Sequence, residues 1–154
     1  MTIFTKRFYL ITLAGLAGGL SEIFWVGMYS AVTHSSGLEV TRQITASLIP
    51  AWTELSIAPV LGITIHLALS VMLAFLCCTF FIEPLARRFG RAWILPVSLA
   101  VLAGIWAINF LVVLPVINPA FVTLLPFLVT LASKMLFGWS MGTILTKGYA
   151  DTAN

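Results

Sequence analysis

The sequence predicts an all-α fold: a polytopic membrane protein with a four-transmembrane-helix bundle and a short outer amphipathic helix. Composition is the first observation behind this prediction, because 60% of the 154 residues are hydrophobic and 8% are charged. A typical soluble domain has about 25% charged residues. The mean hydropathy is +1.08. A soluble chain of this size buries only about two-thirds of its surface, so we expect a bilayer as solvent and one membrane domain over residues 1–154.

The second observation is a set of four long apolar segments, which we expect to cross the membrane at residues 8–32, 57–82, 93–117 and 121–145. Each exceeds the roughly 20 residues needed to cross the hydrocarbon core, so some tilt is expected. The first begins like a signal peptide after Lys6 and Arg7, but its apolar run continues through Trp25 and Val26. That run is too long for a signal peptide, so we expect an uncleaved helix.

The connections between these segments differ in kind. A short basic loop is expected at residues 83–92 and a tight turn at Asn118-Pro119. The segment 33–56 is expected to form the outer amphipathic helix, interrupted near Pro50. Its start fits the capping box Ser36-x-x-Glu39, and its apolar residues recur every four positions at Val40, Ile44, Leu48 and Trp52. An ordinary structured loop is the alternative.

The basic residues are distributed unevenly along the chain. All but one of them flank the apolar segments on one side: Lys6, Arg7, Arg87, Arg88, Arg91 and Lys147, leaving aside the intramembrane Lys134. Only Arg42 falls on the other side. Under the positive-inside rule, both termini are expected in the cytoplasm. The expected partners are the lipid bilayer and either other membrane-protein subunits or a second copy in a homodimer. Nothing predicts a nucleic-acid interface.

One strongly polar residue lies inside each apolar segment, and these four are the candidate site: Glu22, His66, Asn109 and Lys134. At 1.5 Å per residue, they lie about 12–20 Å from the outer ends of their helices. An unpaired charge at mid-bilayer costs roughly 2.5–3.5 kcal/mol. Pairing removes most of that cost, so we expect an intramembrane ion pair between Glu22 and Lys134.

Glycines share a helical face with each of these two charges. The stripe of Glu22 holds Gly15, Gly18 and Gly19, and that of Lys134 holds Gly138 and Gly142. Both stripes contain a GxxxG motif, which lets helices approach closely. We therefore expect the first and fourth helices to pack against each other through these glycines. A homodimer face is the alternative.

Three interpretations of His66 stay open. It is a neutral side chain bonded to a neighbouring helix, a proton relay beside Glu22, or a ligand of haem b or a metal. The only other histidine, His34, lies at the outer boundary, so a second axial ligand at the same depth requires a dimer. No cofactor and no metal is predicted from motifs.

Signatures of soluble enzyme chemistry are missing from the sequence. There is no C-x-x-C, H-E-x-x-H, glycine-rich phosphate loop or G-x-S-x-G. Cys77 and Cys78 are adjacent on a helix, where side chains diverge by about 100° and do not suit a disulfide. We therefore do not expect an enzyme.

Several features together resemble small four-helix bacterial inner-membrane proteins of no assigned activity. They are the glycine-rich first helix, the central His66, and the stretch from Asn109 to Pro115 that runs into Asn118-Pro119. The resemblance implies a bacterial inner membrane. Glu22 in the first of four helices also resembles small multidrug-resistance transporters. This chain departs from them, because it is longer and offers Lys134 as a counter-charge to its glutamate.

Two classes of function follow from these observations. The first is a non-enzymatic accessory or scaffold subunit of a larger membrane complex, which the small extramembrane parts and glycine faces favour. The second is a proton-coupled or small-solute transporter that uses the cluster of Glu22, His66, Asn109 and Lys134. We favour the first from the sequence alone.

Overall fold

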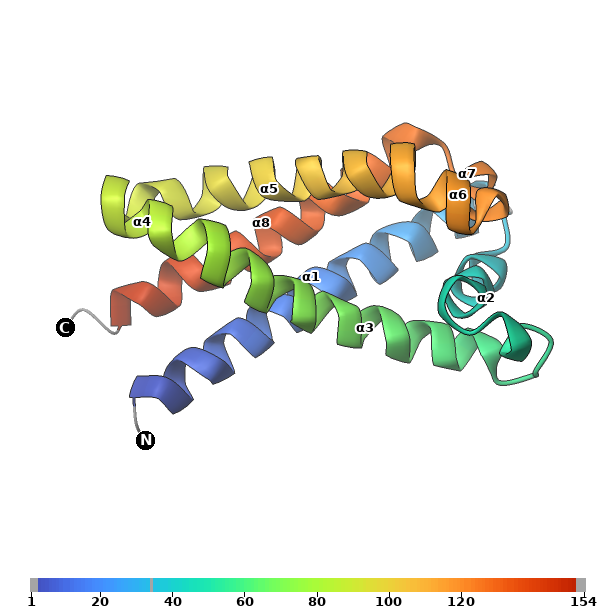
Figure 1. Ribbon diagram of the computed structural model, residues 1–154, viewed down its shortest axis with the longest axis horizontal. Helices are drawn as coiled ribbons and strands as arrows, with labels where there is room; N and C mark the ends of the chain where they lie inside the picture. Colours follow the sequence, from blue (N-terminus) through green and yellow to red (C-terminus); the bar gives the residue numbers. More distant parts are fainter. Residues whose placement is uncertain (1–2, 34, 152–154) are drawn as a thin grey trace.

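Four long helices run side by side through the computed structural model, which describes residues 3–33 and 35–151. They are α1 (Ile3–Thr33), α3 (Ala58–Cys77), α5 (Ile94–Ile108) and α8 (Phe127–Asp151), as Figure 1 shows. The described part contains four helical spans that are long and apolar enough to cross a membrane: Phe4–Thr33, Ala58–Phe89, Arg91–Ile117 and Phe127–Tyr149. The all-helical class and the number of spans agree with the prediction.

A π-helical turn ends two residues before a proline in each of the two middle spans. Turn η2 (Cys78–Ile82) leads into α4 (Glu83–Phe89), and turn η4 (Asn109–Val113) leads into α6 (Leu114–Ile117). A proline inside a helix lacks an N–H and clashes with the carbonyl four residues earlier. The wider turns, with bonds from Glu83 N–H to Cys78 O and from Leu114 N–H to Asn109 O, accommodate Pro84 and Pro115.

The second span is therefore longer than predicted. Its helix continues through Pro84 to Phe89, where we expected a loop from residue 83. The chain turns at Gly90, whose φ of +94° favours glycine. A 3₁₀ turn, η3 (Arg91–Trp93), then leads into α5.

The fourth span differs from the prediction at both of its ends. Residues 119–124 form a separate helix, α7 (Pro119–Leu124), which Asn118 caps by accepting a hydrogen bond from Phe121 N–H. Leu125 is extended, with φ −133° and ψ 141°, because the following Pro126 disfavours the helical region. Helix α8 begins only after this break and runs past residue 145 to Asp151.

The segment between the first two spans forms α2 (Gly37–Leu48). Ser36 caps it by accepting a bond from Glu39 N–H, and the helix ends before Pro50, where η1 (Pro50–Trp52) begins. The predicted cap and interruption are confirmed. Helix α2 packs on α3 so closely that a Cβ on Gly62 would meet the carbonyl oxygen of Thr41.

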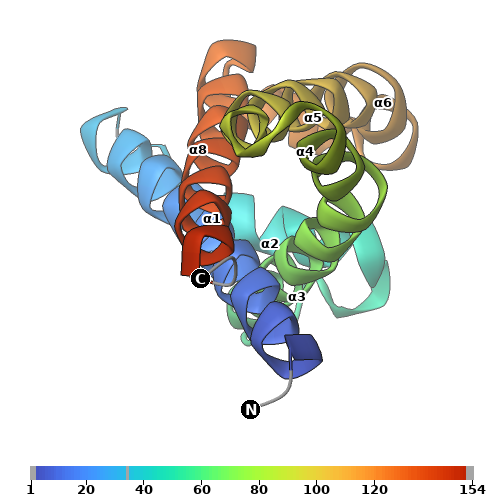
Figure 2. The same ribbon diagram turned by 90° about the vertical axis from the view of Figure 1, so that its left-hand side faces the viewer.

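The second and third spans meet at one end of the bundle, through α4, and α3 and α5 separate toward the other end (Figure 1). Helix α1 packs on both α8 and α3, and α5 packs on α8. The turn η2 and helix α4, which continue the second span after α3, contact α5. We call the end with α4 and both chain termini the closed end, and the end with α2, α6 and α7 the open end (Figure 1). Figure 2 views the molecule from the closed end.

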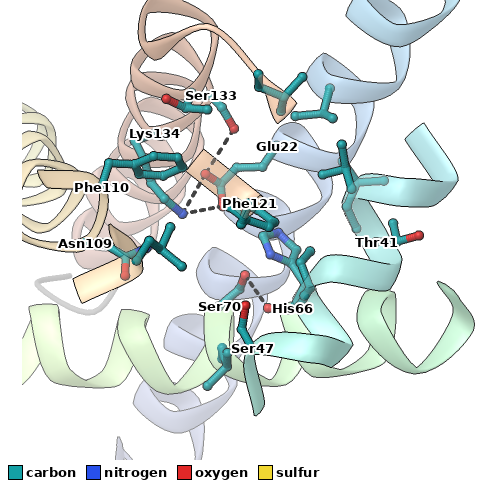
Figure 3. Close-up of a pocket in the computed structure, with 18 of the residues that line it drawn as sticks. Glu22, Thr41, Ser47, His66, Ser70, Asn109, Phe110, Phe121, Ser133 and Lys134 are labelled. Carbon is teal, nitrogen blue, oxygen red and sulfur yellow. Dashed lines mark hydrogen bonds and ion pairs between the residues drawn. The ribbon is translucent and has the colours of Figure 1, made fainter. Parts of the chain in front are cut away.

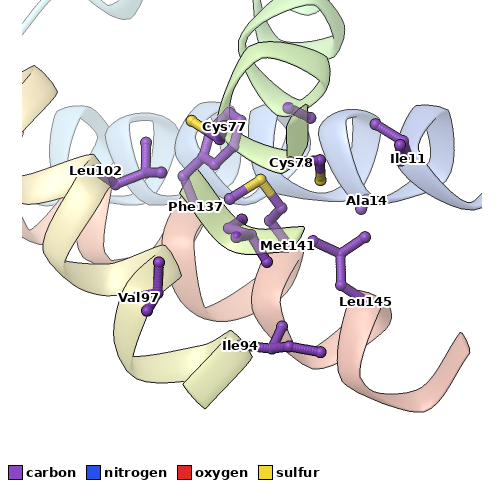
Figure 4. Close-up of a cluster of buried hydrophobic side chains, with 12 residues drawn as sticks. Ile11, Ala14, Cys77, Cys78, Ile94, Val97, Leu102, Phe137, Met141 and Leu145 are labelled. Carbon is purple, nitrogen blue, oxygen red and sulfur yellow. The ribbon is translucent and has the colours of Figure 1, made fainter. Parts of the chain in front are cut away.

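The main hydrophobic core lies toward the closed end. Figure 4 shows side chains from α1, α3, η2, α5 and α8 that meet there: Ile11, Ala14, Cys77, Cys78, Ile94, Val97, Leu102, Phe137, Met141 and Leu145. Ile82 belongs to the same cluster. Phe137, Met141 and Leu145 are fully buried. Both cysteines are free thiols that pack in this core.

The three glycines of the predicted α1 stripe lie at close contacts with two different helices. A Cβ on Gly18 would lie 2.7 Å from the ring of Phe137 in α8, as the predicted packing requires. Gly15 and Gly19 instead face α3, where a Cβ would lie 2.7 Å from Val71 Cα and 2.6 Å from Ser70 Oγ, respectively.

Gly138 and Gly142, the two glycines of the predicted α8 stripe, face α5, whereas Gly148 near the end of α8 faces Leu10 of α1. A Cβ on Gly138 would lie 3.2 Å from Ser98 O, and one on Gly142 would lie 3.0 Å from Leu95 Cδ1. The prediction that the two glycine stripes face each other is therefore wrong. The glycines of a GxxxG motif let a helix approach closely. In α8 that helix is α5, although Lys134 on the same stripe pairs with Glu22 of α1.

Candidate functional site

An ion pair between α1 and α8 is the centre of the candidate site. Lys134 Nζ lies 2.7 Å from Glu22 Oε1 and 2.9 Å from Oε2, so the ammonium bridges both carboxylate oxygens. Ser133 Oγ donates a further bond of 3.1 Å to Oε1. Figure 3 shows these contacts. Glu22 is only 3% exposed, so its charge depends on these partners.

His66 joins this pair from α3. Its Nε2 lies 3.5 Å from Glu22 Oε2 and 3.3 Å from Gly19 O. Both neighbours are acceptors, so a proton on Nε2 can be donated to either. Within residues 3–33 and 35–151, no group of three His, Cys, Asp or Glu is placed to hold a metal ion. His34 lies outside the described residues.

Asn109, the fourth predicted residue, lies near the cluster but does not bond to it. It is the first residue of η4, and its side chain lines the same cavity as Glu22, His66 and Lys134. In the described part of the chain, its amide has no hydrogen-bond partner. The structure thus brings three of the predicted residues into contact and leaves the fourth with unused donors and an unused acceptor.

A cavity of about 560 Å³ borders this cluster. Its lining comes from α2, α3, the third span and the helices around them. In Figure 1, α3 and α5 separate toward the open end, and α2 lies across that end. The polar lining of the cavity includes the four predicted residues, while apolar side chains form most of the rest, among them Leu38, Ile63, Leu69, Val113 and Ile117. This volume falls within the range of small-molecule sites, about 300–1,000 Å³.

Aromatic side chains fix one wall of the cavity. Phe110 and Phe121 line it, with ring centroids 6.1 Å apart. Behind them, Trp106 stacks on Phe110 at 6.0 Å and donates a 3.0 Å bond from Nε1 to Thr130 Oγ1. These contacts connect α5 and η4 to α7 and α8, so side chains from several helices hold this wall in place.

A second buried carboxylate lies at the closed end, and the sequence interpretation missed it. Glu83 receives two bonds of 2.7 Å from Arg7, through Nε and Nη2, and one of 2.6 Å from the hydroxyl of Tyr149. These contacts join α1, α4 and α8. In the sequence, Arg7 precedes the first apolar segment and Glu83 follows the second, on the same expected side of the membrane. Their opposite charges could have indicated this contact.

A third polar contact fastens α2 at the open end. The amide of Asn118 donates to Gln43 Oε1 at 3.1 Å and to Ser47 Oγ at 3.0 Å. Asn118 precedes α7 and is itself buried. The contact therefore holds the cover of the cavity to the segment that follows the third span.

Comparisons with known proteins give no assignment: no family model, no curated protein and no solved structure matches this chain. The resemblance to small four-helix inner-membrane proteins therefore stays a prediction. A proposal for the function rests on the geometry of the cavity and its polar cluster.

Proposed function

We propose that this chain is a multi-pass protein of a bacterial inner membrane that binds and carries a small, mostly apolar solute in its cavity. The observation that carries the proposal is the juxtaposition of a 560 Å³ cavity with a buried, charged cluster. Ionisable groups inside a membrane are costly and usually mark solute or ion pathways. Transporters commonly place their sites where a spanning helix is broken, and here η4 supplies such an irregular turn beside the cavity.

Membrane insertion with both termini in the cytoplasm is part of the proposal. The closed end holds both termini together with Arg87, Arg88 and Arg91, and α2 at the other end contains Arg42. Large apolar side chains are exposed along the outer faces of all four spans, for example Phe24, Met72, Leu111 and Trp139. Lipid would cover these faces.

A matched pair of glycine substitutions tests the cavity. Gly27 lines it, and a Cβ there would meet nothing within 4 Å. Gly104 on α5 has the same free space but is not part of the lining. Gly27→Phe should therefore fill the cavity without disturbing the fold, and Gly104→Phe should leave the cavity open.

Binding is measured with 1-bromododecane, whose bromine quenches tryptophan fluorescence, in lipid nanodiscs. Trp106 packs directly behind the cavity wall and serves as reporter. We expect a saturable component of quenching in the parent protein and in Gly104→Phe, and its loss in Gly27→Phe. Quenching that rises only with the bromine content of the lipid, equally in all three proteins, contradicts the proposal.

The accessory or scaffold subunit predicted from the sequence is the second candidate function. Glu22 already bonds to Lys134 and Ser133 of its own chain. A carboxylate held in this way can stabilise helix packing without taking part in transport, which favours the scaffold. Purification from native membranes with mass spectrometry of co-purifying chains tests it. A stoichiometric partner that still binds Gly27→Phe would support a scaffold that works without the cavity.

A further inference from the structure

We infer that the cavity takes an uncharged amphiphile, a single alkyl or isoprenoid chain that ends in a carbonyl or hydroxyl group. This inference rests on the proposed function and names its substrate class. Three features of the lining carry it: the balance of charge, the free hydrogen-bonding groups, and the apolar path between α3 and α5.

Charge balance argues against an ionic head group. Glu22 and Lys134 are the only acidic and basic side chains among the described residues that line the cavity, and they neutralise each other. The remaining titratable group, His66, is already turned toward Glu22 and Gly19. A charged ligand head would therefore lack a counter-ion in a largely apolar site, where an uncompensated charge is strongly disfavoured.

Free hydrogen-bonding groups favour an oxygen-containing head. The Asn109 amide has two N–H donors and one carbonyl acceptor, all without a partner in the described chain. The ammonium of Lys134 has three donors and uses two directions toward the oxygens of Glu22. A ligand carbonyl can accept from both residues. A hydroxyl can in addition donate to Asn109 Oδ1.

The apolar lining suits a chain that reaches the site from within the bilayer. Side chains of α3 and of the third span, including Ile63, Leu69, Val113 and Ile117, face the cavity from its two sides. These helices separate toward the open end (Figure 1), and the outer faces beside them are apolar as well. A solute dissolved in lipid can enter there without crossing a polar surface.

The test is a series of twelve-carbon molecules that differ only in the head: dodecane, 1-dodecanol, dodecanoate and dodecylammonium. Each competes against 1-bromododecane, and recovery of tryptophan fluorescence reports displacement. We expect 1-dodecanol to compete about three- to tenfold better than dodecane, the range that one neutral hydrogen bond supplies. Both charged molecules should compete less well than 1-dodecanol.

Asn109→Leu serves as the matched variant, since it removes the amide but keeps a similar volume. It should erase the advantage of 1-dodecanol over dodecane, so that the two molecules compete equally against 1-bromododecane. Equal competition by dodecane and 1-dodecanol in the parent protein overturns the inference, even where saturable binding and its loss in Gly27→Phe uphold the cavity. Tighter binding of either charged molecule overturns it too. The comparison in the parent protein does not depend on the folding of any variant.

Discussion

The closed and open ends each contain a buried glutamate paired with a cation, but their surroundings differ. At the closed end, Glu83 is held by Arg7 and Tyr149 beside the packed core that contains Cys78 and Ile82. Toward the open end, Glu22 is held by Lys134 on the wall of a cavity. The first pair ties helices together at the end of the bundle. The second does so where the helices separate, and its groups are available to a ligand.

Glycines mark the same difference between the two ends. Gly18, in the middle of α1, lies directly against the ring of Phe137, whereas Gly27, nine positions later on the same helix, has open space around it. Small residues therefore permit close packing at the first position and leave room at the second. The comparison teaches that a GxxxG stripe identifies where helices meet, while a polar residue beside unfilled space identifies where a ligand can bind.

The largest expected effect comes from breaking the pair beside the cavity. Glu22→Gln leaves the ammonium of Lys134 buried without a counter-charge, and Lys134→Met does the same to Glu22. Each single change should cost about 3–5 kcal/mol, while the double variant should be more stable than at least one single variant. Unfolding of all four proteins in the same detergent measures the coupling. Strictly additive losses would mean that the two residues do not interact.

A smaller effect is expected from adding volume at matched positions on α1. Gly18→Leu forces a side chain into Phe137, and overpacking of this kind costs about 1–3 kcal/mol. Gly27→Leu adds its side chain to open space beside the cavity and should leave the melting temperature nearly unchanged. Thermal unfolding of the two variants sharpens the comparison of the ends. Equal losses would show that α1 is packed as tightly beside the cavity as at the closed end.

The smallest effect is expected at the closed-end pair. Tyr149→Phe removes the hydroxyl that donates to Glu83 but keeps the ring in place. The remaining partners of Glu83 are Arg7 and Arg87, whose side chains are 45% and 76% exposed, so solvent screens both pairs. We expect a loss of about 1 kcal/mol and no change in the binding of 1-bromododecane. Impaired binding in this variant would mean that the two ends are coupled.

Much of the fold follows from patterns that depend on single helices. Apolar length predicted the four spans, and the cap at Ser36 and the break at Pro50 predicted where α2 begins and ends. Depth along the helices also placed Glu22, His66 and Lys134 at similar levels, because the rise per residue is constant. These properties are local or one-dimensional, so a single sequence reveals them.

Other features depend on how neighbouring helices rotate and tilt. Nothing in the spacing of Gly138 and Gly142 distinguishes α5 from α1 as their partner. The π turns before Pro84 and Pro115 are one of several ways to accommodate a proline, so the continuation through Glu83 was read as a loop. The cavity arises from the divergence of α3 and α5, which no motif encodes.

Solid-state NMR of the protein in lipid bilayers tests the central claim most directly, that Glu22 and Lys134 form an ion pair inside the helix bundle. The chain is labelled with ¹⁵N at the lysine Nζ and ¹³C at the glutamate carboxyl carbon. Among the described residues, this is the only lysine–glutamate ion pair, because Glu83 pairs with arginines and Glu39 with Arg42. The account predicts one strong nitrogen–carbon dipolar contact that disappears in Lys134→Met. The absence of any such contact in the parent protein, or its survival in Lys134→Met, would contradict it.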